Sequence, residues 1–262
     1  MALYGVLGDI HGNREALEAA LAVLDEHAID AILCVGDLVG YNPDGNECVA
    51  MLEERGALCI AGNHDLIGTG LLGFERCSNK AMHSLKRTRR ALSPPTIRTL
   101  TSLPAHRRIE GRVVLVHGGV RDVQQYMTQP RHFLQNAAYL RDDFPGATVC
   151  FFGHTHEQGV REVDGESVRE IDTQVPAVRL RSDRLYFVNP GSVDASRKRS
   201  RKFAELAIFD SERLECTFRR VPYDDAATEA RAAAEGYRID RWRDRLYDWQ
   251  RRVMGPRQVD AT

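Results

Sequence analysis

Five short blocks in the first 156 residues contain side chains of the types that bind metal ions. The blocks are residues 8–12, 36–37, 62–65, 117–119 and 153–156, and each contains or adjoins glycine. Their candidate ligands are Asp9, His11, Asp37, Asn63, His64, His117, His154 and His156. Carboxylate and amide oxygens together with imidazole nitrogens suit Mn, Fe, Ni or Zn. No block contains a cysteine, which argues against a cysteine-bound structural zinc site.

The number of candidate ligands predicts two metal ions rather than one, because it exceeds the four ligands of a tetrahedral site. Two ions roughly 3.5–4 Å apart can hold a tetrahedral phosphate, generate a nucleophile at neutral pH and neutralise developing charge. The residue types therefore favour a two-metal site that can hold a phosphate group.

Each block follows a stretch with the apolar character of a buried strand. These stretches are residues 3–7, 31–35, 57–61, 112–116 and 148–152. Helices are predicted over residues 14–27, capped by Asn13, and over 45–55, which gives a βαβ order at the start of the chain. Strands of one parallel sheet share a carboxyl-end edge, where open α/β sheets bind ligands, so we expect the five blocks to converge.

As an ordered set, the blocks resemble the calcineurin-like metallophosphoesterase superfamily, whose pattern is GDxHG, GDxxxxG, GNH[DE], H and GHxH. The resemblance covers about residues 1–210. Residues 36–47 and 117–122 are also similar to the strings GDxVGYGPxPNE and HGSPRD of a bacterial and archaeal branch of small phosphoesterases. The chain departs from these patterns at positions beside the ligands, and the departures bear on substrate preference. They are Asn42, Gly45, Gly119, Val120 and the absence of a second acidic residue after Asp37.

The resemblance implies an α/β fold, a four-layer α/β/β/α sandwich of two mixed sheets with flanking helices. Strands expected near residues 159–163, 167–171, 185–188, 203–209 and 214–221 would complete the sheets. We expect a metallophosphoesterase domain over residues 1–222 and a C-terminal helical extension over 223–262. A helical insert at about residues 66–110 separates the third and fourth blocks, so we expect it near the active site, as a lid or as a plain packed connection.

The resemblance also implies a ligand set. One metal ion would be held by Asp9, His11 and His156, the other by Asn63, His117 and His154, and Asp37 would bridge both. Manganese is the ion we expect first, with Fe, Ni or Zn as alternatives.

Catalytic roles follow from the same resemblance. A bridging hydroxide would attack phosphorus in line, and His64 would protonate the leaving oxygen or stabilise the transition state. Asp65 either orients the His64 imidazole or caps its own turn. Arg121 either clamps the substrate phosphate or pairs with Asp122. Substrate would contact Asn63, His64 and Arg121.

Composition excludes several other classes of protein. The 262 residues are 43% hydrophobic and carry a net charge of −1, so the charge of the whole chain does not favour binding to nucleic acids or membranes. No secretory signal or apolar run of about 18 residues is visible. Six scattered cysteines without a CxxC pattern are expected to be reduced core residues. We expect a cytoplasmic protein.

The function that we expect is hydrolysis of phosphomonoesters or phosphodiesters of a small molecule or nucleotide. A Ser/Thr protein phosphatase and a dinucleoside polyphosphate hydrolase are alternatives within this class, and a metal-binding scaffold is the alternative outside it. A nuclease is favoured only by the basic run at residues 197–202. An apolar stripe in the tail, from Tyr237 to Val253, would pack on its own domain or form a homodimer through the C-terminal helix.

Overall fold

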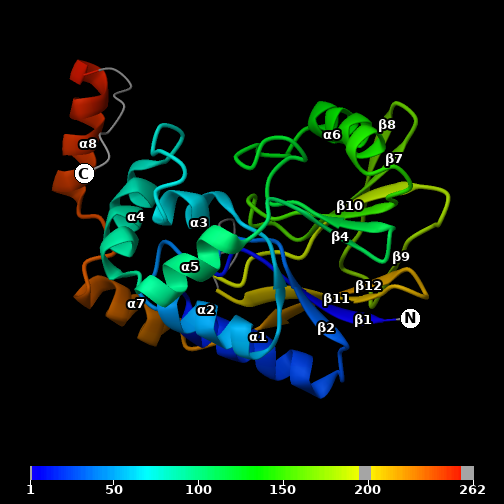
Figure 1. Ribbon diagram of the computed structural model, residues 1–262, viewed down its shortest axis with the longest axis horizontal. Helices are drawn as coiled ribbons and strands as arrows, with labels where there is room; N and C mark the ends of the chain where they lie inside the picture. The colour runs from blue at the N-terminus through cyan, green and yellow to red at the C-terminus, as the bar shows by residue number, and fades with distance from the viewer. Residues whose placement is uncertain (1, 195–201, 255–262) are drawn as a thin grey trace.

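The computed structural model describes residues 2–194 and 202–254 and contains two six-stranded sheets packed face to face (Figure 1). Helices cover the outer side of each sheet, with α6 over one and α1 and α2 over the other. Each sheet contains both parallel and antiparallel pairs. The predicted α/β/β/α sandwich of two mixed sheets is therefore confirmed.

The first sheet has the order β3-β2-β1-β11-β12-β9. Its strands are β1 (Leu3–Leu7), β2 (Ala31–Cys34), β3 (Leu58–Cys59), β9 (Val178–Arg179), β11 (Ala204–Asp210) and β12 (Glu215–Val221). β1 is central: its Val6 pairs in parallel with Leu33 of β2 and antiparallel with Ala207 of β11. The N-terminal strand is thus joined to a strand near the other end of the fold.

The second sheet has the order β4-β5-β6-β10-β7-β8. Its strands are β4 (Arg107–Ile109), β5 (Val113–Leu115), β6 (Val149–Phe151), β7 (Gly159–Asp164), β8 (Ser167–Ile171) and β10 (Leu185–Asn189). β5, β6 and β10 run parallel, and the others pair antiparallel. Gly165 has a φ of +58° in the β7–β8 turn, a conformation that glycine adopts without a side-chain clash.

The described residues form eight helices. They are α1 (Arg14–Glu26), α2 (Gly45–Glu54), α3 (Asn63–Gly68), α4 (Asn79–Ala91), α5 (Pro94–Ser102), α6 (Pro130–Asp143), α7 (Asp225–Ala234) and α8 (Arg241–Met254). The predicted cap of α1 is present, since the Asn13 side chain accepts a hydrogen bond from the Ala16 N–H. Ser78 and Ser93 cap α4 and α5 in the same way within the insert.

The core is divided by the sheets. Val6, Phe151 and Phe209 are fully buried between the sheets. Leu7, which neighbours Val6 in β1, faces the opposite way and packs against α1 and α2. Alternate side chains of β1 are therefore buried on both faces, as expected for a strand covered by a sheet and by helices.

Two expectations about the elements need correction. The strands before the five blocks do not share one parallel sheet, because β1, β2 and β3 belong to the first sheet and β5 and β6 to the second. The helix α6 was not predicted, although Phe133, Ala137 and Leu140 bury one face of it. The blocks still converge, because the carboxyl ends of these strands point to the same end of the sandwich.

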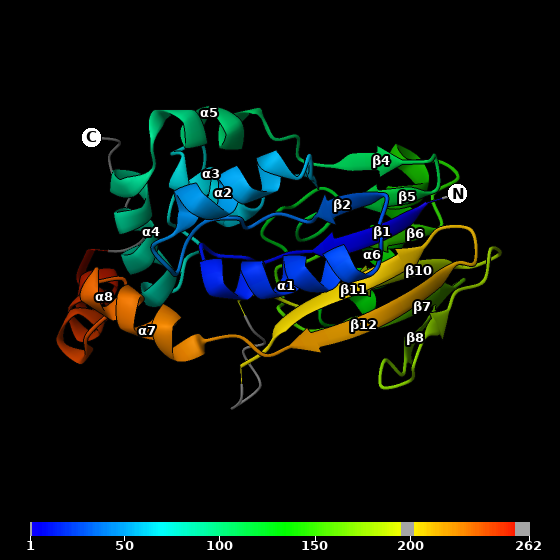
Figure 2. The ribbon, with the colours of Figure 1, turned by 90° about the horizontal axis from the view of Figure 1, so that it is seen from below.

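The tail forms α7 and α8, which lie at the end of the molecule beside α4 (Figures 1 and 2). They are separated near Gly236, and Tyr237 is buried. Trp242 and Trp249 of α8 are 70% and 57% exposed, and a homodimer through this helix stays a prediction. No helix of the described residues is long and apolar enough to cross a membrane. Residues 197–201 of the basic run lie outside the described part of the chain.

Candidate metal centre

The ligand residues leave their strands in an unusual backbone conformation. The φ angles of Asp9, His11, Asp37, His154 and His156 are 51°, 53°, 57°, 65° and 58°. Residues other than glycine rarely adopt this left-handed region, where each costs about 1–3 kcal/mol and is held only by surrounding structure. The local fold thus turns five of the seven predicted ligands sharply off their strands and toward a shared point.

A first group of ligand atoms comes from Asp9, His11 and His156, whose atoms lie within 4.8 Å of one another. The Nε2 atoms of the two histidines are 3.0 Å apart, and Asp9 Oδ1 is 3.6 Å from His156 Nε2. All three residues are buried. This is the set that the family resemblance implies for one ion.

A second group comes from Asp37, His117 and His154 and has the same spacing. Asn63 Oδ1 lies 3.0 Å from His117 Nε2 and adds an amide oxygen. The two oxygens of Asp37 face different groups: Oδ1 is 3.3 Å from His117 Nε2, and Oδ2 is 3.7 Å from His11 Nε2. Asp37 therefore lies where a bridging carboxylate would lie.

The donor set fits divalent transition metals, and two of its four imidazoles are held by their outer nitrogens. His11 Nδ1 is 3.2 Å from the Val39 carbonyl oxygen, and His117 Nδ1 is 2.8 Å from the Val35 carbonyl oxygen. A hydrogen bond from Nδ1–H to a carbonyl leaves Nε2 with its lone pair directed at the centre, which is how metal-binding histidines are usually oriented.

The charges of the cluster also suit a cation. Burial alone would raise the pKa of Asp37, but the imidazoles of His117, His64 and His11 outweigh it and hold this pKa well below its usual range. Burial alone would lower the pKa of His117, whereas Asp37 and Asp9 raise it to about 9. A buried carboxylate at the centre of several imidazoles thus stabilises positive charge around it.

The end of β10 and the turn after it hold Asp9 in place. The sequence did not predict this role for them. Ser192 Oγ donates a 2.9 Å hydrogen bond to the Asp9 carbonyl oxygen, and Asn189 Nδ2 donates to the Gly153 carbonyl oxygen. The His154 N–H donates in turn to Asp9 Oδ1. The first and fifth blocks are thereby held together, and the Ser192 hydroxyl supports the backbone of Asp9.

The predicted general acid, His64, lies at the edge of the centre. Its ring centroid is 4.5 Å from that of His11 and 4.7 Å from that of Tyr41. The backbone N–H of His64 donates a hydrogen bond to Asp37 Oδ1. Gly40, with a φ of +113°, leaves room for it, because a Cβ there would lie 2.2 Å from His64 Nδ1. Its position is compatible with proton transfer to a substrate held between the metal ions.

We predict that Gly40→Ala lowers kcat by about 10²-fold, because the added methyl group must displace the His64 ring and small misplacements are costly in catalysis. The matched control is Gly111→Ala: Gly111 also has a positive φ, of +74°, but a Cβ there meets no atom within 4 Å. Steady-state kinetics with equal metal loading would compare the two. Equal losses in both variants would assign the effect to backbone strain alone.

Asp65 makes hydrogen bonds that favour the capping interpretation. Its carboxylate accepts from the N–H groups of Gly62, Asp37, Leu38 and Val39 at 2.8–3.1 Å. Burial and the charge of Asp37 raise the pKa of Asp65 to about 7. The N–H donors act in the opposite direction, because they stabilise the ionised carboxylate. Asp65 thus ties the second block to the third and shapes the turn that carries Asp37.

We predict that Asp65→Asn lowers the free energy of unfolding by about 2–4 kcal/mol, because an amide cannot accept all of these backbone bonds. Urea denaturation of the metal-free protein measures the loss. If Asp65 instead orients His64, stability would be retained and turnover of the metal-loaded enzyme would fall.

Arg121 is not among the residues that line the cavity over the candidate metal centre. Its Nε and Nη2 donate to Asp143 at 2.8 and 2.7 Å, and its guanidinium lies 4.2 Å from the centroid of Tyr139. The alternative pairing with Asp122 is wrong, because Asp122 pairs with Arg76. Arg121 borders a separate cavity of about 340 Å³ behind His117, and its role as a phosphate clamp stays a prediction.

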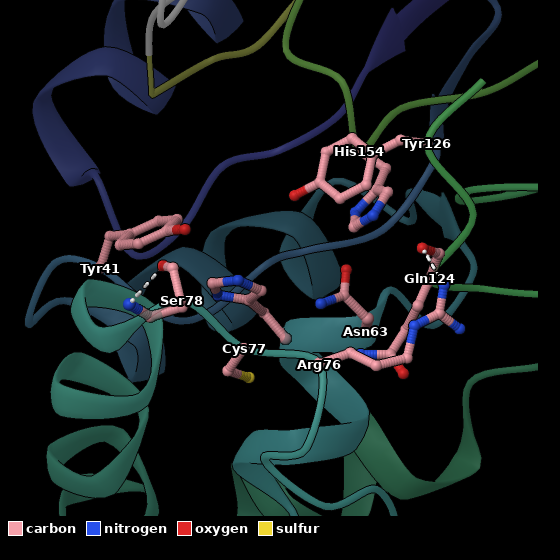
Figure 3. A pocket seen from close by; sticks show the side chains of 10 residues that line it. Tyr41, Asn63, Arg76, Cys77, Ser78, Gln124, Tyr126 and His154 are labelled. Carbon is pink, nitrogen blue, oxygen red and sulfur yellow. Dashed lines mark hydrogen bonds between the residues drawn. The ribbon is translucent and has the colours of Figure 1, made fainter. Parts of the chain in front are cut away.

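A cavity of about 140 Å³ opens above the candidate metal centre (Figure 3). Its lining residues are Tyr41, Asn63, His64, Arg76, Cys77, Ser78, Ala81, Gln124, Tyr126 and His154. The insert therefore supplies one wall, through residues 76–78 and 81. Tyr41 belongs to the family-like string at residues 36–47, whereas the sequence offered no signal for Arg76 or Tyr126, because their approach to the centre depends on how distant loops pack.

Comparisons with known proteins agree with this geometry. The sequence model of the calcineurin-like phosphoesterase superfamily domain matches residues 2–213. An uncharacterised protein of Methanocaldococcus jannaschii is 28% identical over 228 residues, which are 85% of this chain and 88% of that protein.

Two solved structures are also similar. A metallophosphoesterase from Sphaerobacter thermophilus is 28% identical with a TM-score of 0.73, over 93% of this chain and 97% of that chain. A hypothetical protein from Pyrococcus horikoshii shares the fold at 18% identity and a TM-score of 0.68, over 94% of this chain and 97% of that chain. With the family pattern matched over most of its length and an Asp/His cluster at the expected place, the chain belongs to the calcineurin-like phosphoesterase superfamily.

Proposed function

We propose that the protein is a dinuclear-metal phosphoesterase that hydrolyses phosphomonoesters or phosphodiesters. The observation that carries the proposal is the position of Asp37, whose two carboxylate oxygens face two separate groups of ligand atoms. Two divalent ions bound there would activate water and offset the negative charge that develops on the phosphate. Manganese is the ion proposed first, with Fe, Ni or Zn as alternatives.

The residues would act as follows. Asp9, His11 and His156 would hold one ion, Asn63, His117 and His154 the other, and Asp37 both. His64 lines the cavity and would donate a proton to the leaving oxygen. Asn63 lines the same cavity and would contact the substrate phosphate.

The size of the cavity favours a small substrate. Its volume of about 140 Å³ is below the range of roughly 300–1,000 Å³ that is usual for drug-sized ligands. The cavity therefore has room for the reacting phosphate and one small group, with the rest of any larger molecule outside.

The test is metal add-back to the stripped protein, with p-nitrophenyl phosphate and bis-p-nitrophenyl phosphate as substrates. Mn, Ni or Zn should restore turnover and Mg should not, because imidazole ligands suit the transition metals better. The ratio of the two rates would tell a monoesterase from a diesterase. Two bound ions without turnover of either ester would instead support the scaffold function.

A further inference from the structure

An aromatic side chain stands at the mouth of the cavity. Tyr126 lies in the segment between β5 and α6, and its ring centroid is 4.0 Å from that of His154, one of the predicted metal ligands. Tyr126 is 47% exposed, and among the described residues it is the only exposed large apolar side chain that lines this cavity. A group attached to a phosphate at the centre would therefore meet the Tyr126 ring.

A second tyrosine forms the opposite wall. The Tyr41 ring centroid lies 4.6 Å from that of His11 and 4.7 Å from that of His64. Figure 3 shows Tyr41 on one side of the cavity and Tyr126 with His154 on the other, and Asn63 lies below His154 in this view. The two tyrosine rings thus border the cavity over the candidate centre.

The insert holds the segment that carries Tyr126. Arg76 Nη1 donates to both carboxylate oxygens of Asp122 at 2.9 Å, and its Nη2 donates to the Gln124 carbonyl oxygen at 2.8 Å. Asp122 Oδ1 also accepts from the Gln124 N–H. Because the Arg76 and Asp122 side chains are 52% and 46% exposed, their pair adds little stability. Its consequence is geometric, since it fixes the chain two residues before Tyr126.

We propose that Tyr126, positioned by Arg76, stacks on a planar aromatic group close to the reacting phosphorus, and that the preferred substrates are phosphoesters carrying such a group. This inference rests on the proposed function and adds the substrate class. Aryl esters and nucleotides both present a flat ring to Tyr126. Stacking on an aromatic side chain recognises either ring by its face and not by its hydrogen-bonding edge.

The experiment compares phosphate esters that carry an aromatic ring with esters that lack one. AMP and ribose 5-phosphate share a leaving group, so the ratio of their kcat/KM values measures recognition of the base. For aryl esters, the measurement is the kcat/KM value of p-nitrophenyl phosphate divided by that of butyl phosphate. These two esters have different leaving groups, but the difference is the same in every variant. A change in the ratio between variants therefore reports on recognition of the ring. The manganese-loaded variants are Tyr126→Ser, Tyr126→Phe and Arg76→Ala. Arg181→Ala is the control, because Arg181 forms a similar exposed bidentate pair, with Asp183, and does not line the cavity.

Tyr126→Ser should lower the aromatic preference about tenfold in at least one arm, a loss within the range for removing a stacking side chain. The arm that responds identifies the aryl ester or the nucleotide as the source of the ring. Tyr126→Phe should keep the preference. Arg76→Ala should lower it in part and add nothing to Tyr126→Ser in the double variant, while Arg181→Ala changes neither ratio.

Two results would overturn the inference and are distinguishable. Unchanged ratios in both arms for Tyr126→Ser, with an active wild-type enzyme, overturn the role of Tyr126 alone. No turnover of any of the four esters by the metal-loaded wild-type protein overturns the proposed function and this inference with it.

Discussion

Replacing His64 by alanine is expected to lower kcat by about 10²–10⁴-fold, the usual contribution of a general acid, while both metal ions stay bound. The reason is position: the imidazole borders the cavity beside Asn63, and the ligand set predicted for the two ions does not include it. The measurement is kcat with p-nitrophenyl phosphate at saturating Mn, together with metal content by mass spectrometry.

The control for this variant is His106→Ala. His106 is an exposed histidine that packs against Phe144, and it does not line the cavity over the candidate centre. A loss of bound metal in His64→Ala would give the residue a different role. Its ligand atom lies within 4.8 Å of those of His11 and Asp37, so that outcome would make His64 a metal ligand.

Replacing Asp37 by asparagine is expected to remove turnover and to lower metal affinity by more than about 100-fold, the upper end for outer-shell partners of a metal site. The substitution keeps the shape of the side chain but removes the carboxylate that faces both ligand groups. Titration calorimetry of the metal-free protein with Mn would give the affinity and the number of ions bound.

Asp44→Asn is the matched control for the loss of a buried carboxylate. Asp44 is 8% exposed and pairs with Arg231, with Nε and Oδ2 3.1 Å apart, and it is not part of the predicted ligand set. This variant should bind two ions with wild-type affinity. Two ions bound with unchanged affinity in Asp37→Asn would contradict the bridging position.

Much of this architecture could be predicted because local patterns and tertiary packing agree. The run from Leu3 to Leu7 is apolar and ends at a glycine, and it forms β1 with the predicted bounds. Asn13 and the spacing of Leu17, Leu21 and Leu24 predicted α1, which the structure contains with one residue fewer at its end. The helix α6 was missed because no motif flanks it, although Pro130 at its first turn is a start signal.

Side chains whose partners are distant in the chain could not be placed from the sequence. Arg121 carries a charge that suits phosphate, but it forms an ion pair with Asp143, the last residue of α6. Asp65 was expected either to orient His64 or to cap its own turn, and its oxygens also accept hydrogen bonds from the backbone of residues 37–39. The types of the candidate ligands were enough to predict a metal site from the sequence. The contacts of Arg121 and Asp65 depend on the packing of loops, which no local pattern specifies.

The pairing of β1 with β11 has a consequence for synthesis of the protein. Leu3 pairs with Asp210, so β1 leaves the ribosome well before its partner β11, which follows roughly 200 residues later. At about 5–20 residues per second, that partner emerges about 10–40 s after β1. The brace from Ser192 to the Asp9 carbonyl also arrives late. A nascent chain thus carries every predicted ligand before the first of them is fixed, and it completes the centre only when its last strands dock.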